Sequence, residues 1–210
     1  MTAASPLPIG RLLRANIGEF VVGTRSRRLE DDLAFGGLVA APVSPQVTLY
    51  GLVADIRIPD DDLVRQLTLS TEGAAPEVVA DQRENRLAPV EIRVLTVGYQ
   101  DAHGRHYVLP PRPPLSLTDI RMCPPDEVVA FTTAAEQPGY LRHVVRGRDW
   151  PVADLIAAHL RQAQAAHRAH PQGRADWARG AIQYLIQLLR DDYELLSQVL
   201  DAVRDALPPA

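Results

Sequence analysis

The sequence contains no lysine, so all 22 of its basic residues are arginine. A phosphate-binding loop of the Walker type needs a lysine after its last glycine, and this class of nucleotide site is therefore excluded. The single cysteine, Cys123, cannot form an internal disulfide, and the sequence indicates no neighbour that would activate its thiol. We expect Cys123 to act as a small buried hydrophobe.

Aromatic residues are also scarce, and the chain has no excess of positive charge. Aromatics make up 5% of the chain, with only 3 Phe, which leaves no interleaved stacking surface for single-stranded nucleic acid. The formal net charge is -4 and the pI is about 5.8, so the whole chain is no general nucleic-acid binder. The first eight residues lack the apolar segment of a signal peptide, and no stretch approaches the roughly 20 apolar residues of a membrane span. We expect a cytoplasmic protein.

The composition that remains is typical of a globular domain, with 46% hydrophobic and 23% charged residues, and its N-terminal half carries strand signals. The stretch from Val47 to Ile56 is almost wholly β-branched or apolar, and Gly51 inside it favours a bend or bulge. Ala88 to Gln100 alternates along its length, and a polar turn then leads to a returning strand, which predicts a hairpin. With the shorter glycine-punctuated strands before them, these segments predict a mainly β domain over residues 8–131: a closed, antiparallel, six-stranded barrel.

Two segments connect this domain to the rest. Four prolines between Pro110 and Pro114 require an extended, stiff chain, interpreted as a strap across the barrel rather than as a ligand for a proline-recognising groove. Leu115 to Phe131 is compatible with further short strands, or with one strand and a helical turn. Residues 132–149 are expected to form a linker.

From Trp150 onward the periodicity becomes helical. A first helix is expected at about residues 152–166, after an acidic residue and Pro151. A second helical stretch covers about residues 174–207, and Arg190-Asp191-Asp192 interrupts its apolar face with charge. The absence of glycine and proline there favours one long helix bent at Asp191, with a pair of helices as the alternative.

The apolar face of this second stretch is too long for the first helix alone to cover. Leaving it in water would forgo on the order of 1.5–3 kcal/mol for each large side chain. It must therefore pack on the barrel or on another chain, and we expect an interface with a second copy of the chain or with a partner subunit. The residues of this predicted interface are Trp177, Tyr184, Leu188, Leu195, Leu196, Val199 and Val203.

Chemistry-bearing side chains are few, and no catalytic residue, cofactor site or metal site is predicted. Two pairs of histidines, 103 with 106 and 167 with 170, lack further ligands at metal-binding spacing and are interpreted as polar turn residues. The acidic run 60–62 is interpreted as a solvated helix start. A compact basic loop could contact phosphates through Arg25, Arg27 and Arg28. A second basic cluster comprises Arg142, Arg146 and Arg148.

The strand pattern resembles the HAS-barrel, the N-terminal domain of HerA-type DNA translocases. The resemblance is carried by Ile9-Gly10-Arg11-Leu12, Gly18-Glu19-Phe20-Val21-Val22, Phe35-Gly36-Gly37-Leu38-Val39 and Leu49-Tyr50-Gly51-Leu52-Val53-Ala54-Asp55-Ile56, with Leu109 to Pro114 similar to the proline-rich exit of such barrels. It covers roughly residues 8–131. The family continues into an ATPase domain, whereas this chain continues into helices, so the ATPase activity does not carry over.

The resemblance implies a non-catalytic barrel whose relatives serve in ring assembly and in docking a nuclease such as NurA. We therefore expect an oligomeric accessory or adaptor subunit of a bacterial translocase–nuclease system in DNA end processing, repair or defence. It would contact DNA indirectly, if at all. The alternatives are a DNA-binding module that uses the Arg25–Arg28 loop and the Arg142–Arg148 cluster, and a purely structural oligomeric protein.

Overall fold

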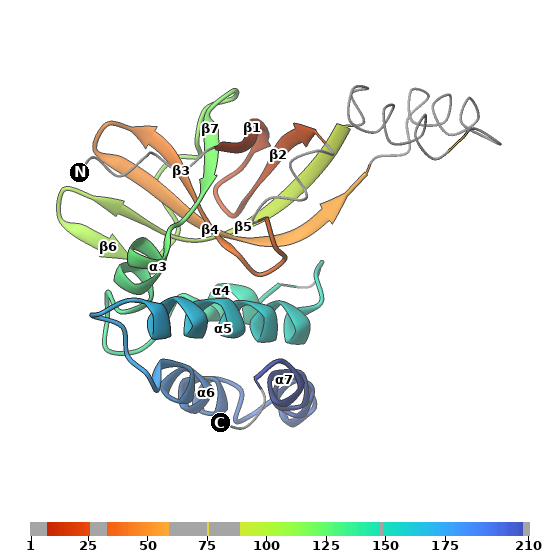
Figure 1. Cartoon of the computed structure of the whole chain (residues 1–210), viewed down its shortest axis with the longest axis vertical. Coiled ribbons are helices and arrows are strands. Elements are labelled where there is room, and N and C mark those ends of the chain that lie inside the picture. Colours follow the sequence, from red (N-terminus) through yellow and green to blue (C-terminus); the bar gives the residue numbers. More distant parts are fainter. Residues whose placement is uncertain (1–7, 26–32, 59–74, 76–88, 148, 208–210) are drawn as a thin grey trace.

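The structure is a computed structural model that describes residues 8–25, 33–58, 75, 89–147 and 149–207. The N-terminal part forms a β-barrel, and the C-terminal part forms helices stacked against one side of it (Figure 1). Seven strands are described: β1 (Pro8–Ala15), β2 (Glu19–Arg25), β3 (Leu38–Ser44), β4 (Val47–Arg57), β5 (Pro89–Asp101), β6 (Gly104–His106) and β7 (Asp119–Met122).

Six of these strands close the barrel. The strand order is β2-β1-β7-β3-β4-β5-β6, and a further pairing of β2 with β5 joins the sheet to itself, so that only β6 stands outside the closed ring. All of the pairings are antiparallel. Closure leaves no strand edge within the ring unpaired. The predicted six-stranded antiparallel barrel is confirmed.

The barrel interior is apolar because alternate residues of each strand point inward. Its buried side chains come from β1 to β5 and β7: Ile9, Leu12, Phe20, Val22, Val39, Ala41, Leu49, Val53, Val90, Ile92, Val94 and Ile120. The predicted irregularity at Gly51 is present, since the register of β4 against β5 shifts between Tyr50 and Gly51. A Cβ atom at Gly51 would lie 2.4 Å from Val94 Cγ1, so only glycine permits this close approach.

After the β5–β6 hairpin the chain runs without helix or strand to β7, and this run includes the proline-rich segment. Pro110 and Pro114 are buried while Pro111 and Arg112 are exposed, the pattern of a strap lying along the domain. Beyond β7 comes α3 (Pro125–Thr132). Of the alternatives for residues 115–131, a strand followed by helix is therefore observed, with a helix longer than one turn.

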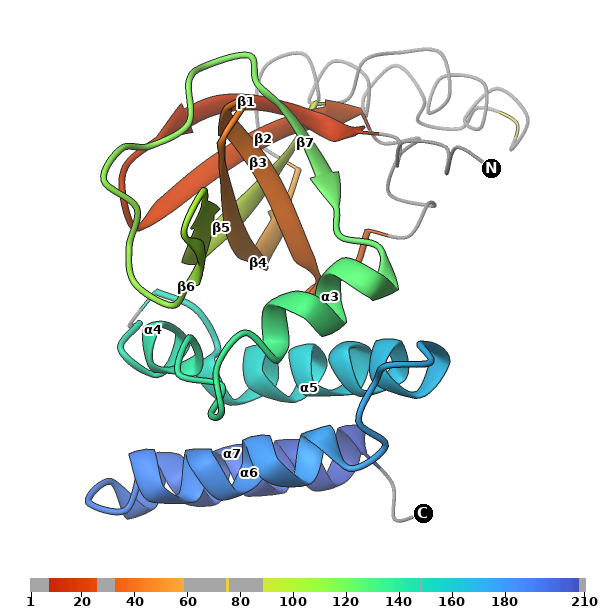
Figure 2. The ribbon, with the colours of Figure 1, turned by 90° about the vertical axis from the view of Figure 1, so that its left-hand side faces the viewer.

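The remaining helices form two layers. They are α4 (Leu141–Val145), α5 (Val152–Ala169), α6 (Trp177–Leu188) and α7 (Tyr193–Ala206). α5 lies between the barrel on one side and α6 with α7 on the other (Figure 2). The expected linker, residues 132–149, carries α4 and contributes the buried side chains Tyr140, Leu141 and Val144 to the core. That segment is thus part of the packed structure.

The second helical stretch is a pair of helices, which corrects the favoured interpretation of one long helix. α6 ends at Leu188, and Leu189 to Asp192 form the turn. The Asp192 side chain accepts a hydrogen bond from the Leu195 backbone N–H at 3.1 Å, so it caps the start of α7. An aspartate satisfies an otherwise unpaired donor at a helix start, so Asp192 marks the break between the two helices although the turn contains neither glycine nor proline.

Candidate functional site

A buried histidine fastens the helical layer to the barrel. His159 of α5 has its Nδ1 3.0 Å from the Gly36 carbonyl and its Nε2 2.8 Å from the Tyr140 hydroxyl. The carbonyl can only accept, so Nδ1 carries the proton and Nε2 accepts from the tyrosine. Burial lowers the pKa of His159 to about 4, which keeps the ring neutral in the folded protein.

Two further contacts hold the helical layer to the barrel. The Gln162 side-chain amide donates to the Phe35 carbonyl at 2.7 Å. Arg93 of β5 bonds Glu19 of β2 at 2.6 Å and lies over the Trp150 ring, with its guanidinium carbon 5.5 Å from the ring centroid. The helices are therefore fixed to the barrel at separated points, which orients them as one unit.

A second buried histidine holds the helices to one another. His167 Nδ1 accepts from the Arg174 backbone N–H at 3.0 Å, so Nε2 carries the proton and donates to the Thr132 hydroxyl at 2.8 Å. Its ring stacks on Trp177 with centroids 5.0 Å apart. Burial lowers the pKa of His167 to about 4. Both nitrogens are engaged, so His167 does not present a metal ligand together with His170.

A polar cluster attaches α3 to the barrel wall. Glu127 receives two bonds from Arg121, at 2.5 and 3.0 Å, and one from the Tyr50 hydroxyl at 2.9 Å. The pKa of Tyr50 is raised by burial and then by the charge of Glu127. Burial also raises the pKa of the adjacent Cys123 thiol well above its usual value. The Cys123 thiol is therefore protonated at neutral pH and is no activated nucleophile.

The residues considered for metal binding do not gather. His106 pairs with Asp101 at 2.9 Å, and His103 is exposed in the same turn. Among the residues that the structure describes, no group of three or more His, Cys, Asp or Glu could hold a metal ion. The acidic run 60–62 lies outside the described residues.

The two basic clusters are placed only in part. Arg25 ends β2, whereas Arg27 and Arg28 lie outside the described residues, as does Arg148. Arg142 bonds the carbonyl oxygens of Gly139 and Tyr107, and its guanidinium is half-buried in that role. Arg142 is therefore a structural residue of the segment before α5.

The predicted interface residues are divided between core and surface. Trp177, Val199 and Val203 are buried within the chain, because α5 covers the inner sides of both α6 and α7. Tyr184, Leu195 and Leu196 are half-buried and pack on the same core. Leu188 is exposed. Trp177, Val199 and Val203 are thus part of the monomer core and are not free to contact another chain.

Other large apolar residues of the two helices are exposed instead. Tyr193 is 81% exposed, and Ile186 and Leu200 are exposed as well. With Leu188 these residues form what we call the outer edge: Ile186, Leu188, Tyr193 and Leu200, around the α6–α7 turn and along α7. Helical spacing alone does not separate the outer edge from the buried face, because both are apolar and the split depends on where α5 lies.

No protein-family model matches the chain, and no curated protein is significantly similar to it. None of the described helices has the length and apolar character needed to cross a lipid bilayer.

Proposed function

We propose that the protein is a non-catalytic adaptor whose helical layer binds another protein. The observation that carries this proposal is the outer edge, a set of large apolar side chains left in water on a well-packed scaffold. Tyr193 and Leu200 lie seven residues apart on one face of α7, and exposed apolar surface of this kind is typical of interaction sites. The adjoining core of α5, α6 and α7 is tightly buried, so the edge is presented in a fixed orientation.

The class of partner is suggested by the resemblance to the HAS-barrel. Closed six-stranded barrels of that family work in assemblies with a translocase ATPase and a nuclease. The closed barrel of β1 to β5 and β7 fits the barrel part of this description, and helices follow it where those relatives carry their ATPase domain. A HerA-type ATPase or a NurA-type nuclease is therefore the partner to test first, with an oligomer of the chain itself as the second candidate.

The experiment is light scattering on size-exclusion columns, with the full chain alone and mixed with the translocase or nuclease encoded by the same cells. We expect a stable complex that is lost in Leu188→Glu/Tyr193→Glu. The matched control is Leu115→Glu, a change at a leucine that is 72% exposed on the strap of the barrel. A full chain that stays monomeric, alone and in every mixture, would overturn the proposal.

The DNA-binding alternative has a separate readout in a gel shift. A salt-sensitive shift that disappears in Arg27→Ala/Arg28→Ala would replace the adaptor with a phosphate-binding module. The second basic cluster adds little to that alternative, because Arg142 already bonds two backbone carbonyls.

A further inference from the structure

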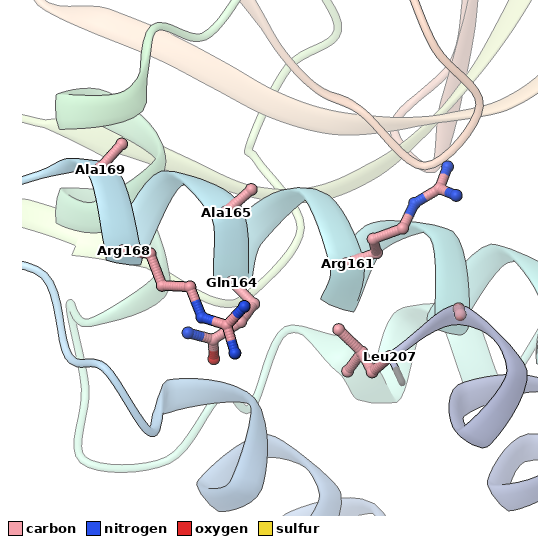
Figure 3. Close-up of a pocket in the computed structure, with 7 residues that line it drawn as sticks. Arg161, Gln164, Ala165, Arg168, Ala169 and Leu207 are labelled. Carbon is pink, nitrogen blue, oxygen red and sulfur yellow. The ribbon is translucent and has the colours of Figure 1, made fainter. Parts of the chain in front are cut away.

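The surface of α5 that faces solvent has a depression on each side of an exposed alanine edge. One, of about 540 Å³, lies beside the end of α7 and is lined by Arg161, Gln164, Arg168 and Leu207 (Figure 3). The other, of about 590 Å³, lies against α3 and the β7–α3 connection, with Met122, Pro125, Val128 and Ala166 in its lining. Ala165 and Ala169 belong to both.

These alanines allow a second helix to approach α5 closely. Ala165 and Ala169 are exposed and one helical turn apart, so no large side chain stands between the α5 backbone and an approaching helix. Axes of packed helices are 8–10 Å apart, and small residues at the contact favour the short end of that range. Large side chains of the approaching helix would then enter the two depressions on either side of the alanine edge.

The exposed lining argues against a small-molecule pocket. Arg161, Ala165, Arg168 and Ala169 are all exposed, so this depression is open to solvent along its length. Sites for small molecules enclose most of the ligand surface, whereas a helix in a groove needs only its apolar side covered.

Two arginines give this surface its charge. Arg161 and Arg168 are seven residues apart, which places them two turns, or about 10.5 Å, apart along α5. Both residues line the depression, and Figure 3 shows their side chains leaving α5 toward different sides, Arg161 toward the barrel and Arg168 toward α6. Neither takes part in the ion pairs found among the described residues.

Two other exposed arginines of the helical layer are already paired. Arg190 lies 3.3 Å from Asp191, and Arg204 lies 3.1 Å from Asp201. Among the exposed arginines of the described helical layer that make no ion pair, Arg161 and Arg168 line this depression, whereas Arg146, Arg174 and Arg179 do not.

We propose that this surface binds an amphipathic helix of a partner protein that carries acidic residues seven positions apart beside its apolar face. The acidic residues would pair with Arg161 and Arg168, and the apolar side chains would fill the depressions along Ala165 and Ala169. The inference rests on the proposed adaptor function and adds to the outer edge a second contact surface, with the chemistry of the helix that it would bind.

The test is fluorescence anisotropy with the full-length protein and two synthetic 18-residue helical peptides. Both carry the same leucine stripe; one has Glu and the other Lys at two positions seven residues apart. We expect the Glu peptide to bind at least tenfold more tightly, with a difference that shrinks at high salt. Arg161→Glu/Arg168→Glu should remove this preference, and Ala165→Trp should weaken binding at least tenfold by filling the edge.

The matched control is Arg190→Ala/Arg204→Ala, which removes two arginines that are already paired and should leave binding unchanged. Equal binding of both peptides, absence of binding by the Glu peptide, or loss in the control variant alone would overturn the proposal. Self-association of the free protein that is lost in Arg161→Glu/Arg168→Glu would identify a second copy as the occupant and would also overturn it.

Failure here is distinguishable from failure of the adaptor function. A complex that forms with the translocase or nuclease and survives Arg161→Glu/Arg168→Glu keeps the adaptor function and removes this surface from it. A protein that binds the Glu peptide but forms no complex in any mixture loses the adaptor function.

Discussion

The interior of the barrel and the core of the helical layer are both buried, but different forces order them. The barrel interior is filled with aliphatic side chains and Phe20, and the strand ladders set its register. The helical layer also buries polar side chains, and each makes directional bonds: Thr132, His159, Gln164 and His167. Backbone pairing fixes a strand, whereas a helix packed on a sheet needs side-chain bonds to fix where it lies.

The largest expected effects come from removing one aromatic ring from the barrel and one from the helical layer. Phe20→Ala in the barrel and Phe131→Ala in the helical layer should each destabilise the fold by about 3–5 kcal/mol, because both rings are wholly buried. Trp150 and Trp177, the two tryptophans, both lie in the helical layer, so urea unfolding followed by tryptophan fluorescence reports that layer. If Phe131→Ala left the fluorescence midpoint unchanged, the layer would not be packed as described.

Acidification should destabilise the helical layer more than the barrel. His159 has a folded-state pKa of about 4 against an ordinary value near 6.5, so the unfolded chain takes up the proton more readily. The contribution of His159 to the free energy of unfolding is therefore fully present above pH 6.5, and it is lost as the pH falls toward 4. At about 1.4 kcal/mol per pKa unit, His159 alone contributes a loss of about 3 kcal/mol.

The pH experiment compares urea midpoints at pH 7 and pH 4.5 by tryptophan fluorescence. His167 acts in the same direction, since its pKa is also lowered to about 4. His159→Gln should reduce the pH dependence of the midpoint, and His103→Gln, in an exposed turn of the barrel, should not. A midpoint that stays constant from pH 7 to pH 4.5 would contradict the neutral, buried histidines.

A smaller effect is expected at the ion pair between α3 and the barrel. Glu127→Gln leaves Arg121 without its charged partner, and Glu127 is largely buried, so a loss of about 1–3 kcal/mol is expected. The exposed pair of Arg11 with Asp119 is the comparison, because Arg11→Ala should cost less than about 1 kcal/mol. Equal losses in the two variants would show that Glu127 does not hold α3. Urea titration measures both.

The smallest effect concerns the break between α6 and α7. Asp192→Ala removes the cap on α7 and should destabilise the protein by about 1 kcal/mol. Asp191→Ala, one residue earlier, makes no capping bond and is the control. Thermal unfolding followed by circular dichroism would detect the difference, and identical midpoints would argue for a continuous helix.

How far the sequence could predict the structure follows the same division. The barrel was predictable because alternation along β5 and the glycine in β4 are local signals that strand pairing preserves. Which apolar residues of α6 and α7 are buried and which are exposed was not predictable, because the burial of Val199 and the exposure of Leu188 depend on where α5 lies in space.

The candidate surface on α5 was out of reach of sequence reasoning for the same reason. Arg161 and Arg168 look like ordinary solvent-facing residues of a helix, and only the packing of α3 and α7 creates depressions beside them. His159 and His167 gave a partial signal, as His159 falls on the apolar face of the first predicted helix. Their hydrogen-bond partners come from segments too distant in the sequence to be paired by spacing.

The central claim is that the barrel serves as a scaffold while the helical layer makes the contact with a partner. Hydrogen exchange on the assembly isolated from native cells, compared with the free protein, tests it most directly. The account predicts added protection in peptides from α5, α6 and α7 and unchanged exchange in β1 to β5. Protection confined to the barrel strands, with the helices unchanged, would contradict it.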